Sequence, residues 1–286
     1  MISAPDLAAR LRLKKFPRSW RGDCPACGYA RAFSLRAGHH RPLLYCANGC
    51  DRDTLGDAAA RAAGGTWEPP TRDLAAEASS RERKQAAARR LWSDAVPAAG
   101  TLADRYLAGR CLPDLATSPR LRFFADTPHP EAGRLPAMIA AVSDAAGDLV
   151  AVHRTYLDAT TARKARVEPA KASLGPVWGG AVRLHAVAAE LVIGEGIETA
   201  ASAWKLLQLP AWAAISAGNL ARGLVLPSEV RQVVIAVDPD QSGEAAAQSA
   251  VDRWTREGRK VRLLRPSGHG DFNDLLVSRV QEAPHG

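Results

Sequence analysis

The stretch VVIAVDPDQSGEAAA, residues 233–247, decides the fold of the C-terminal part of the chain. It begins with a β-branched apolar run of the kind that forms a strand buried on both faces. Two carboxylates, Asp238 and Asp240, follow this run directly, and Pro239 between them stiffens the turn. A helical segment over residues 242–258 comes next, with acidic residues early and basic residues late, as the helix dipole favours. We therefore predict a strand, an acidic turn and a helix.

The residues around this stretch repeat the same alternation. Short apolar runs at 190–194, 211–216 and 260–264 have the length of buried strands, and residues 197–209 have a helical pattern. Strands that alternate with helices predict a mostly parallel sheet with helices on both faces. We expect residues 186–286 to form one Rossmann-like α/β domain.

Carboxylates follow the predicted strands at three places. Glu195 comes after the first run, Asp238 and Asp240 after the central one, and Asp271 and Asp274 after the last. Open α/β sheets bind ligands at the carboxyl ends of their strands, and clustered carboxylates repel each other unless a cation lies between them. The five side chains are our predicted Mg²⁺ ligands. Taken singly, each has a plainer interpretation as a surface residue, a turn or a helix cap.

Four of the five cysteines lie in CPACGYARAFSLRAGHHRPLLYCANGC, residues 24–50. Their spacing is C-x2-C-x18-C-x3-C, which suits two knuckles on one tetrahedral Zn²⁺, with the spacer folding as a hairpin. The predicted ligands are Cys24, Cys27, Cys46 and Cys50. His39 and His40 are expected at the hairpin tip, because four thiolates already close a structural site. We expect a zinc-ribbon domain over residues 1–65.

The basic charge is concentrated away from the acidic site. The formal net charge is +8, made of +6 over residues 1–65, +4 over 66–185 and −2 over 186–286. This distribution favours a nucleic-acid enzyme with a cationic guide and a carboxylate-lined metal site, although a solvated basic surface would give the same count. No apolar run is long enough for a membrane span, and the N-terminus lacks a secretory signal. We expect an intracellular protein without a membrane partner.

The middle of the chain divides into two predicted parts. Residues 66–98 should form a polar linker and a basic helix, and residues 99–185 a small basic α+β subdomain. Its clearest element is a β-hairpin over residues 136–157, with turn formers at its centre. Arg154 at the end of the hairpin, together with Arg163 and Lys164 in the following loop, could contact a phosphate backbone, while a solvated charged loop is the equal alternative.

These motifs together resemble a known family. GEGIETA, VVIAVDPDQSGEAAA and DFNDLL, in this order, are similar to the Toprim domain that DnaG-type primases, topoisomerases and some nucleases share. The resemblance implies that Glu195 is a general acid or base, that Asp238 and Asp240 bind Mg²⁺, and that Asp271, Asn273 and Asp274 form the primase D-x-N-D stretch. The cysteine ribbon resembles the primase zinc-binding domain, with Cys27 where that family commonly has His.

The resemblance implies a DNA primase of a phage, plasmid or mobile element. It would synthesise short primers from nucleoside triphosphates on single-stranded DNA, with catalytic Mg²⁺ and structural Zn²⁺, in a cytoplasmic, nucleoid-associated setting. The chain ends soon after DFNDLL, so a replicative helicase, where one is needed, is expected to act in trans. Two alternatives stay open: a Toprim-type nuclease, which needs only water as nucleophile, and a non-catalytic nucleic-acid-binding module.

Overall fold

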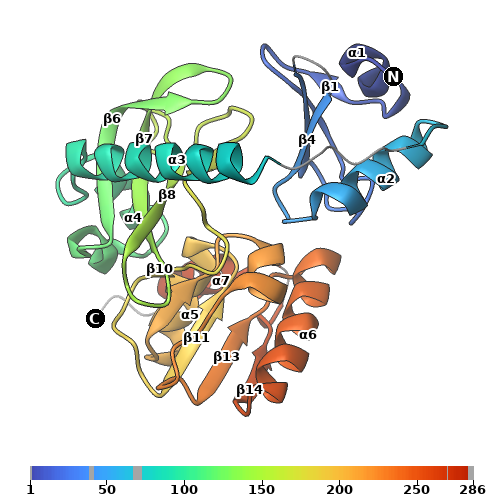
Figure 1. Ribbon diagram of the computed structural model, residues 1–286. Helices are drawn as coiled ribbons and strands as arrows, with labels where there is room; N and C mark the ends of the chain where they lie inside the picture. The colour runs from blue at the N-terminus through green and yellow to red at the C-terminus, as the bar shows by residue number, and fades with distance from the viewer. Residues whose placement is uncertain (1, 39–41, 67–72, 269, 283–286) are drawn as a thin grey trace. The chain divides into compact units, whose positions relative to one another are not determined.

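The protein divides into two compact units, Met1–Glu77 and Ala78–Gly286. The computed structural model describes residues 2–38, 42–66, 73–268 and 270–282 (Figure 1). The predicted hairpin tip at His39 and His40 lies outside the described residues. Within the described residues, no helix is both long enough and apolar enough to span a membrane.

The first unit is an antiparallel sheet packed against two helices. The strands follow in chain order as β1 (Lys14–Lys15), β2 (Trp20–Gly22), β3 (Phe33–Ala37) and β4 (Pro42–Cys46), and the helices are α1 (Ala4–Arg10) and α2 (Arg52–Ala62). The predicted spacer hairpin is confirmed, because β3 pairs with β4 between the two cysteine pairs. Phe33 and Leu35 point from β3 into a core that also contains Leu55 of α2.

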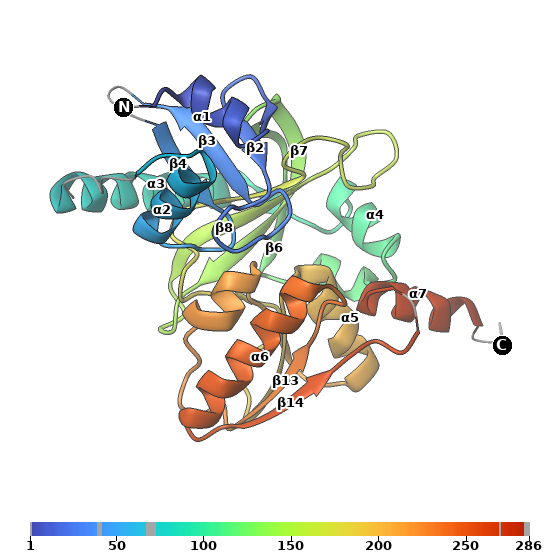
Figure 2. The ribbon, with the colours of Figure 1, turned by 90° about the vertical axis from the view of Figure 1, so that its right-hand side faces the viewer.

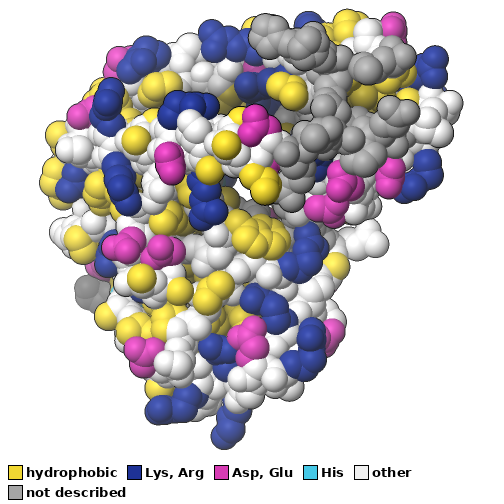
Figure 3. Space-filling view, viewed as in Figure 1, with side chains coloured by type: hydrophobic (Ala, Val, Ile, Leu, Met, Phe, Trp, Pro, Cys, Tyr) yellow, Lys and Arg dark blue, Asp and Glu magenta, His cyan; other side chains and the backbone are white. Residues whose placement is uncertain are grey.

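A long helix, α3 (Leu74–Asp94), packs against the middle sheet of the second unit. Within the segment 66–98, predicted as a linker and a basic helix, the helix begins at Leu74, because Asp73 caps it by accepting a hydrogen bond from the Ala76 backbone N–H at 2.9 Å. Ala88 and Leu91 are buried against the sheet, while the basic residues of the helix stay exposed. Figure 3 shows Lys and Arg side chains over this face.

The middle sheet has five antiparallel strands in chain order. They are β5 (Val96–Pro97), β6 (Leu121–His129), β7 (Gly133–Ser143), β8 (Leu149–Tyr156) and β9 (Lys171–Leu174), with α4 (Leu102–Ala108) and the short helix η1 (Pro113–Thr117) between the first two. The predicted hairpin is confirmed as β7 and β8. Both faces of this hairpin are buried, because Ile139 packs toward α3 and Met138 toward the C-terminal core.

The C-terminal sheet has the order β10-β12-β11-β13-β14, and its last four strands are parallel. The strands are β10 (Val182–Arg183), β11 (Glu190–Gly194), β12 (Ala211–Ala213), β13 (Gln232–Ala236) and β14 (Lys260–Leu264). The helices are α5 (Ile197–Leu207), η2 (Asn219–Gly223), α6 (Gln241–Arg256) and α7 (Phe272–Glu282). The predicted mixed α/β fold with parallel strands is therefore confirmed.

The order of the strands fixes where the helices lie. The connection through α5 runs from β11 to one neighbour, β12, whereas the connection through α6 runs from β13 to the opposite neighbour, β14. Right-handed crossovers in opposite directions place their helices on opposite faces of the sheet. Figure 2 shows α6 in front of β13 and β14, with α5 behind. The direction of winding thus reverses between β11 and β13, which is the usual ligand position in such sheets.

Candidate functional site

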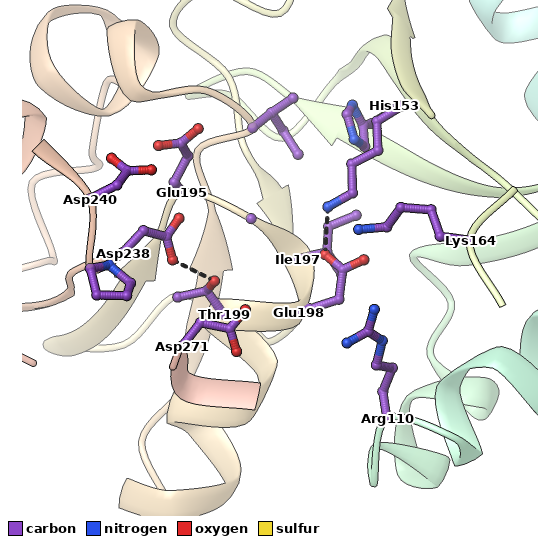
Figure 4. Close-up of a pocket in the computed structure, with 14 residues that line it drawn as sticks. Arg110, His153, Lys164, Glu195, Ile197, Glu198, Thr199, Asp238, Asp240 and Asp271 are labelled. Carbon is purple, nitrogen blue, oxygen red and sulfur yellow. Dashed lines mark hydrogen bonds and ion pairs between the residues drawn. The ribbon is translucent and has the colours of Figure 1, made fainter. Parts of the chain in front are cut away.

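The carboxyl ends of β11 and β13 open into a pocket of about 340 Å³. Glu195 follows β11 directly, Asp238 and Asp240 follow β13, and Asp271 precedes α7. All four line the pocket. Figure 4 shows Glu195, Asp238 and Asp240 on one side of it and Arg110, His153 and Lys164 on the other. The structure therefore brings together four of the five predicted acidic residues at the point where the sheet reverses its winding.

Asp238 and Asp240 are held by the turn between β13 and α6. The Thr199 hydroxyl donates a hydrogen bond to Asp238 at 2.8 Å, and Asp240 caps α6 by accepting from the Gly243 N–H at 2.7 Å. Position 243 has to be glycine, because a Cβ there would lie 2.4 Å from the Asp238 carbonyl oxygen. Burial and the nearby charges of Asp271 and Asp240 raise the pKa of Asp238 despite the Thr199 hydrogen bond.

Glu195 is fixed through its backbone. Its carbonyl oxygen accepts a hydrogen bond at 2.7 Å from the N–H of Ile215, which also lines the pocket. Ile215 has φ of +74°, a left-handed conformation that costs free energy for a β-branched residue. Such strain concentrates at functional sites, where the surrounding structure holds it in place. Next to it, Gly194 lets α5 approach the strand, because a Cβ there would lie 2.7 Å from the Ala200 backbone nitrogen.

Asp271 and Asp274 occupy different surroundings. Asp271 lines the pocket and also accepts hydrogen bonds from the N–H groups of Asn273 and Asp274 at 2.8 and 2.9 Å. Asp274 accepts one from the Asp271 N–H at 3.1 Å and is not among the pocket-lining residues. The pair thus forms a reciprocal cap at the start of α7. The plainer interpretation of Asp274 as a capping residue fits this placement better than the predicted role as a metal ligand.

The acidic side of the pocket suits a hard divalent cation. Its donors are carboxylate oxygens, which Mg²⁺ prefers, and the raised pKa of Asp238 reflects negative charge that a cation would neutralise. The carboxylates gather less tightly than the cysteines. In the described part of the chain, the four cysteines are the one group of three or more ligand residues that the structure brings within 4.8 Å of one another. A looser group is appropriate for Mg²⁺, which keeps waters and binds substrate phosphates.

The opposite side of the pocket is basic and comes from the middle sheet and its connections. Its members are Arg110, Lys164, Lys171 and His153, and we call them the basic wall. Asn273 fixes Arg110 by accepting from its guanidinium at 3.1 Å and donating to its carbonyl oxygen at 2.8 Å. Burial and the charge of Lys171 lower the pKa of His153 to about 3, so His153 is neutral at physiological pH.

Glu198 lies within the basic wall and is the buried acid of the site, with 8% exposure. Lys171 donates to one carboxylate oxygen at 2.8 Å, and the Tyr106 hydroxyl donates to the other. Burial alone would raise the pKa of Glu198, but the charges of Lys171 and Lys164 and the two hydrogen bonds outweigh it and lower the pKa. The carboxylate is therefore ionised and paired.

The three predicted nucleic-acid contacts have three different placements. Lys164 lines the pocket, and Arg163 is exposed in the loop between β8 and β9. Arg154 is 7% exposed, and its guanidinium donates to the carbonyl oxygens of Pro128, Ala172 and Ser173. This buried arrangement ties neighbouring strands together. We therefore withdraw the template-binding role for Arg154.

Four charged or titratable residues that line the pocket were not predicted as site residues: Arg110, His153, Lys171 and Glu198. Tyr106, which contacts Glu198 without lining the pocket, was not predicted either. Glu198 could have been found, because it stands three residues after Glu195 at the start of a predicted helix. Lys171 belongs to a loop whose cations were noted only as a group. For Arg110 and Tyr106 the sequence gives no signal, because their approach to the pocket depends on how α4 packs.

The four cysteines of the first unit form a closed cluster. The Cys24 and Cys50 sulfurs are 3.9 Å apart, and those of Cys27 and Cys46 are 3.8 Å apart. Tetrahedral Zn²⁺ with bonds of about 2.3 Å to sulfur would separate the sulfurs by about 3.8 Å. The two knuckles turn at Gly28 and Gly49, with φ of +71° and +75°. The donors and their spacing therefore fit a structural zinc ion.

Burial and the neighbouring thiolate of Cys24 raise the pKa of Cys46 to about 12. Four thiols this close together do not ionise jointly without a cation, and zinc binding releases their protons. Asn48 adds an outer contact by donating to the Cys27 sulfur at 3.5 Å. The cluster has no open position for a substrate, so its role is to hold β3, β4 and the two knuckles together.

Comparisons with known proteins agree with this architecture. Residues 190–282 match the family model described as Toprim domain, and residues 82–184 match one described as a domain of unknown function (DUF7146). A search of curated proteins gives no match.

The chain is similar to several solved structures of primases. The zinc-binding and RNA polymerase domains of Aquifex aeolicus primase align over 97% of this chain and 83% of theirs, with 14% identity and a TM-score of 0.51. A primase domain from Pseudomonas aeruginosa gives 16% identity, coverage of 68% and 74%, and a TM-score of 0.46. The primase fragment of the bacteriophage T7 primase-helicase protein gives 14%, 92% and 95%, and 0.44. Residues 190–282 are thus a Toprim domain, and the chain has a primase-like fold with an N-terminal cysteine cluster.

Proposed function

We propose that the chain is a DNA primase-like nucleotidyltransferase that makes short primers on single-stranded DNA during replication of a phage, plasmid or mobile element. The observation that carries the proposal is the pocket at the carboxyl ends of the Toprim strands, in which Glu195, Asp238 and Asp240 face the basic wall. The likeness of fold to Aquifex aeolicus primase supports the reaction class.

The acidic side would hold the metal. We assign Asp238 and Asp240 as Mg²⁺ ligands, because both lie on the turn after β13 and line the pocket. We add Asp271, which lines the same pocket. Bound Mg²⁺ would neutralise charge on the triphosphate during attack by a 3′-hydroxyl. We assign Glu195 to proton transfer at that hydroxyl, since its carboxylate lines the same pocket.

The basic wall would hold phosphate groups. Arg110, Lys164 and Lys171 carry three positive charges against the single negative charge of Glu198, so the wall has a net positive charge that attracts a triphosphate. The exposed Arg163 and the basic residues of α3 are candidates for the template backbone. The four-cysteine cluster would shape a unit that helps to select the start site.

A primer-synthesis assay tests the proposal. The zinc-loaded chain is given single-stranded DNA of defined sequence, labelled nucleotides and Mg²⁺. We expect short products that disappear with Asp238→Ala and persist with Asp252→Asn, which changes an exposed carboxylate of α6 outside the pocket. Products that are unchanged in Asp238→Ala would refute the assignment. Nicking of DNA without nucleotides, lost in the same variant, would instead favour the Toprim nuclease.

A further inference from the structure

Glu198 has no place in the metal-binding side of the pocket, although it stands three residues from Glu195. It lies in the first turn of α5 among the cations of the basic wall, as Figure 4 shows for Lys164 and Arg110. A buried carboxylate is costly unless it is paired and hydrogen-bonded. The Glu198 carboxylate is buried together with two partners that offset this cost, so its role is to be sought in what these partners do at the pocket.

The two partners of Glu198 differ in what they leave free. Tyr106, in α4, is 2% exposed, and its hydroxyl donates its one hydrogen bond to the carboxylate. It therefore has no donor left for a ligand. The Lys171 side chain keeps 32% exposure and lines the pocket. Its ammonium has three donors, and the contact with Glu198 at 2.8 Å uses one of them. The ammonium is therefore anchored from behind and still has donors for a ligand.

This arrangement resolves a problem that Lys171 would otherwise have. A lysine side chain is flexible, and Lys164 and Arg110 in the same wall repel its charge. The Glu198 carboxylate supplies the opposite charge and a fixed direction, while Tyr106 prevents the carboxylate from turning. Fixing a donor before the ligand arrives reduces the entropy lost on binding.

We propose that Glu198 is a positioning residue that, together with Tyr106, holds the Lys171 ammonium in place to bind a phosphate of the incoming nucleoside triphosphate. The inference deepens the proposed function and rests on it, because it assumes that the pocket takes a nucleotide. A purely structural ion pair between β9 and α5 is the competing explanation, and coupling between the residues separates the two.

The experiment is a thermodynamic cycle on nucleotide binding. Calorimetry measures the affinity of the zinc-loaded full chain for ATP with Mg²⁺ in wild type, Glu198→Gln, Lys171→Met and the double variant. Glu198→Gln keeps the shape of the side chain and removes its charge. We expect it to weaken binding roughly tenfold, a coupling of the size usual for residues in contact. In the Lys171→Met background the same change should alter the affinity less than about twofold, because a residue that acts only through Lys171 has nothing left to position.

Two further variants guard against trivial outcomes. Tyr106→Phe should also weaken ATP binding, by a smaller factor than Glu198→Gln does, and only when Lys171 is present. Glu190→Gln, at the other end of β11 and paired with exposed Arg262, is the matched control and should leave the affinity unchanged. Thermal unfolding of every variant shows whether it is folded under the conditions of the titration.

The outcomes distinguish this inference from the proposed function. Equal losses from Glu198→Gln with and without Lys171, or no loss in wild type, would overturn the positioning role even if primers are made. Coupled losses of nucleotide binding in a chain that makes no primers would sustain it and refute the primase. A wild-type chain that binds no nucleotide would overturn both.

Discussion

The two candidate metal sites of this protein are built in opposite ways. The four cysteine sulfurs of the first unit lie within 4.8 Å of one another, so one ion would fill the space between them. The carboxylates of the second unit share a pocket of about 340 Å³ without closing on a centre. A closed set of ligands serves folding, whereas an open set leaves room for substrate oxygens and water. The comparison predicts that losing metal unfolds one unit and only inactivates the other.

Removal of zinc should have the largest effect. Because the first unit has a small core, and zinc binding to such sites contributes on the order of 10 kcal/mol, Cys46→Ser should abolish zinc binding and unfold this unit. The second unit should stay folded on its own core. Hydrogen exchange checks both units in one experiment, with Cys111→Ser, outside the cluster, as control. Protected amides in β3 and β4 of a zinc-free variant would contradict the structural role.

Asp238→Asn should separate activity from stability. Loss of a metal ligand should cut primer synthesis roughly a thousandfold, equivalent to about 4 kcal/mol of transition-state stabilisation. Because the fold raises the pKa of Asp238, its charged form destabilises the metal-free protein above the ordinary aspartate pKa. Without metal, Asp238→Asn should therefore have a Tm no lower than that of metal-free wild type at neutral pH. A lower Tm together with retained activity would mean that Asp238 serves structure rather than metal binding.

His153 provides a pH test of the basic wall. Its folded-state pKa of about 3 lies below the unfolded value near 6.5, so the unfolded chain takes up the proton first. The contribution of His153 to stability is therefore lost as the pH falls from about 6.5 toward 3, and the loss reaches about 2 kcal/mol at pH 5. His153→Gln should reduce the drop in unfolding free energy between pH 7 and 5 by that amount in urea titrations. If the unfolding free energies of wild type and His153→Gln fell by the same amount between pH 7 and 5, His153 would not be buried as a neutral group.

Asp274→Ala is expected to have the smallest effect. Because Asp274 closes the cap of α7 outside the pocket, its loss should cost about 1 kcal/mol of stability and leave divalent-cation affinity unchanged. Asp271→Ala, which alters a pocket-lining carboxylate, is the comparison. Equal losses of cation affinity in the two variants would restore Asp274 to the predicted set of ligands.

The sequence predicted those features that depend on local patterns. Strand and helix periodicity gave the sheet, and the position of acids after strands gave Glu195 and Asp238, because parallel strands end at one edge. The cysteine spacing gave the cluster for the same local reason. The basic wall depends on how β8, β9 and α4 pack against α5. Such packing between distant segments produces no periodic pattern in the sequence. Arg154 illustrates the error that results, because a cation within a strand of the hairpin, as Arg154 is in β8, can donate to carbonyl oxygens as readily as to phosphate.

The proposed primer synthesis requires a divalent cation bound between the turn after β13 and the end of β11. Diffraction from crystals of the full chain grown with Mn²⁺ and a nucleoside triphosphate, collected at the manganese absorption edge, tests this most directly. The predicted result is an anomalous peak in contact with the Asp238 and Asp240 carboxylates, with triphosphate oxygens completing its coordination. A nucleotide bound elsewhere, or manganese peaks only outside this pocket, would contradict it.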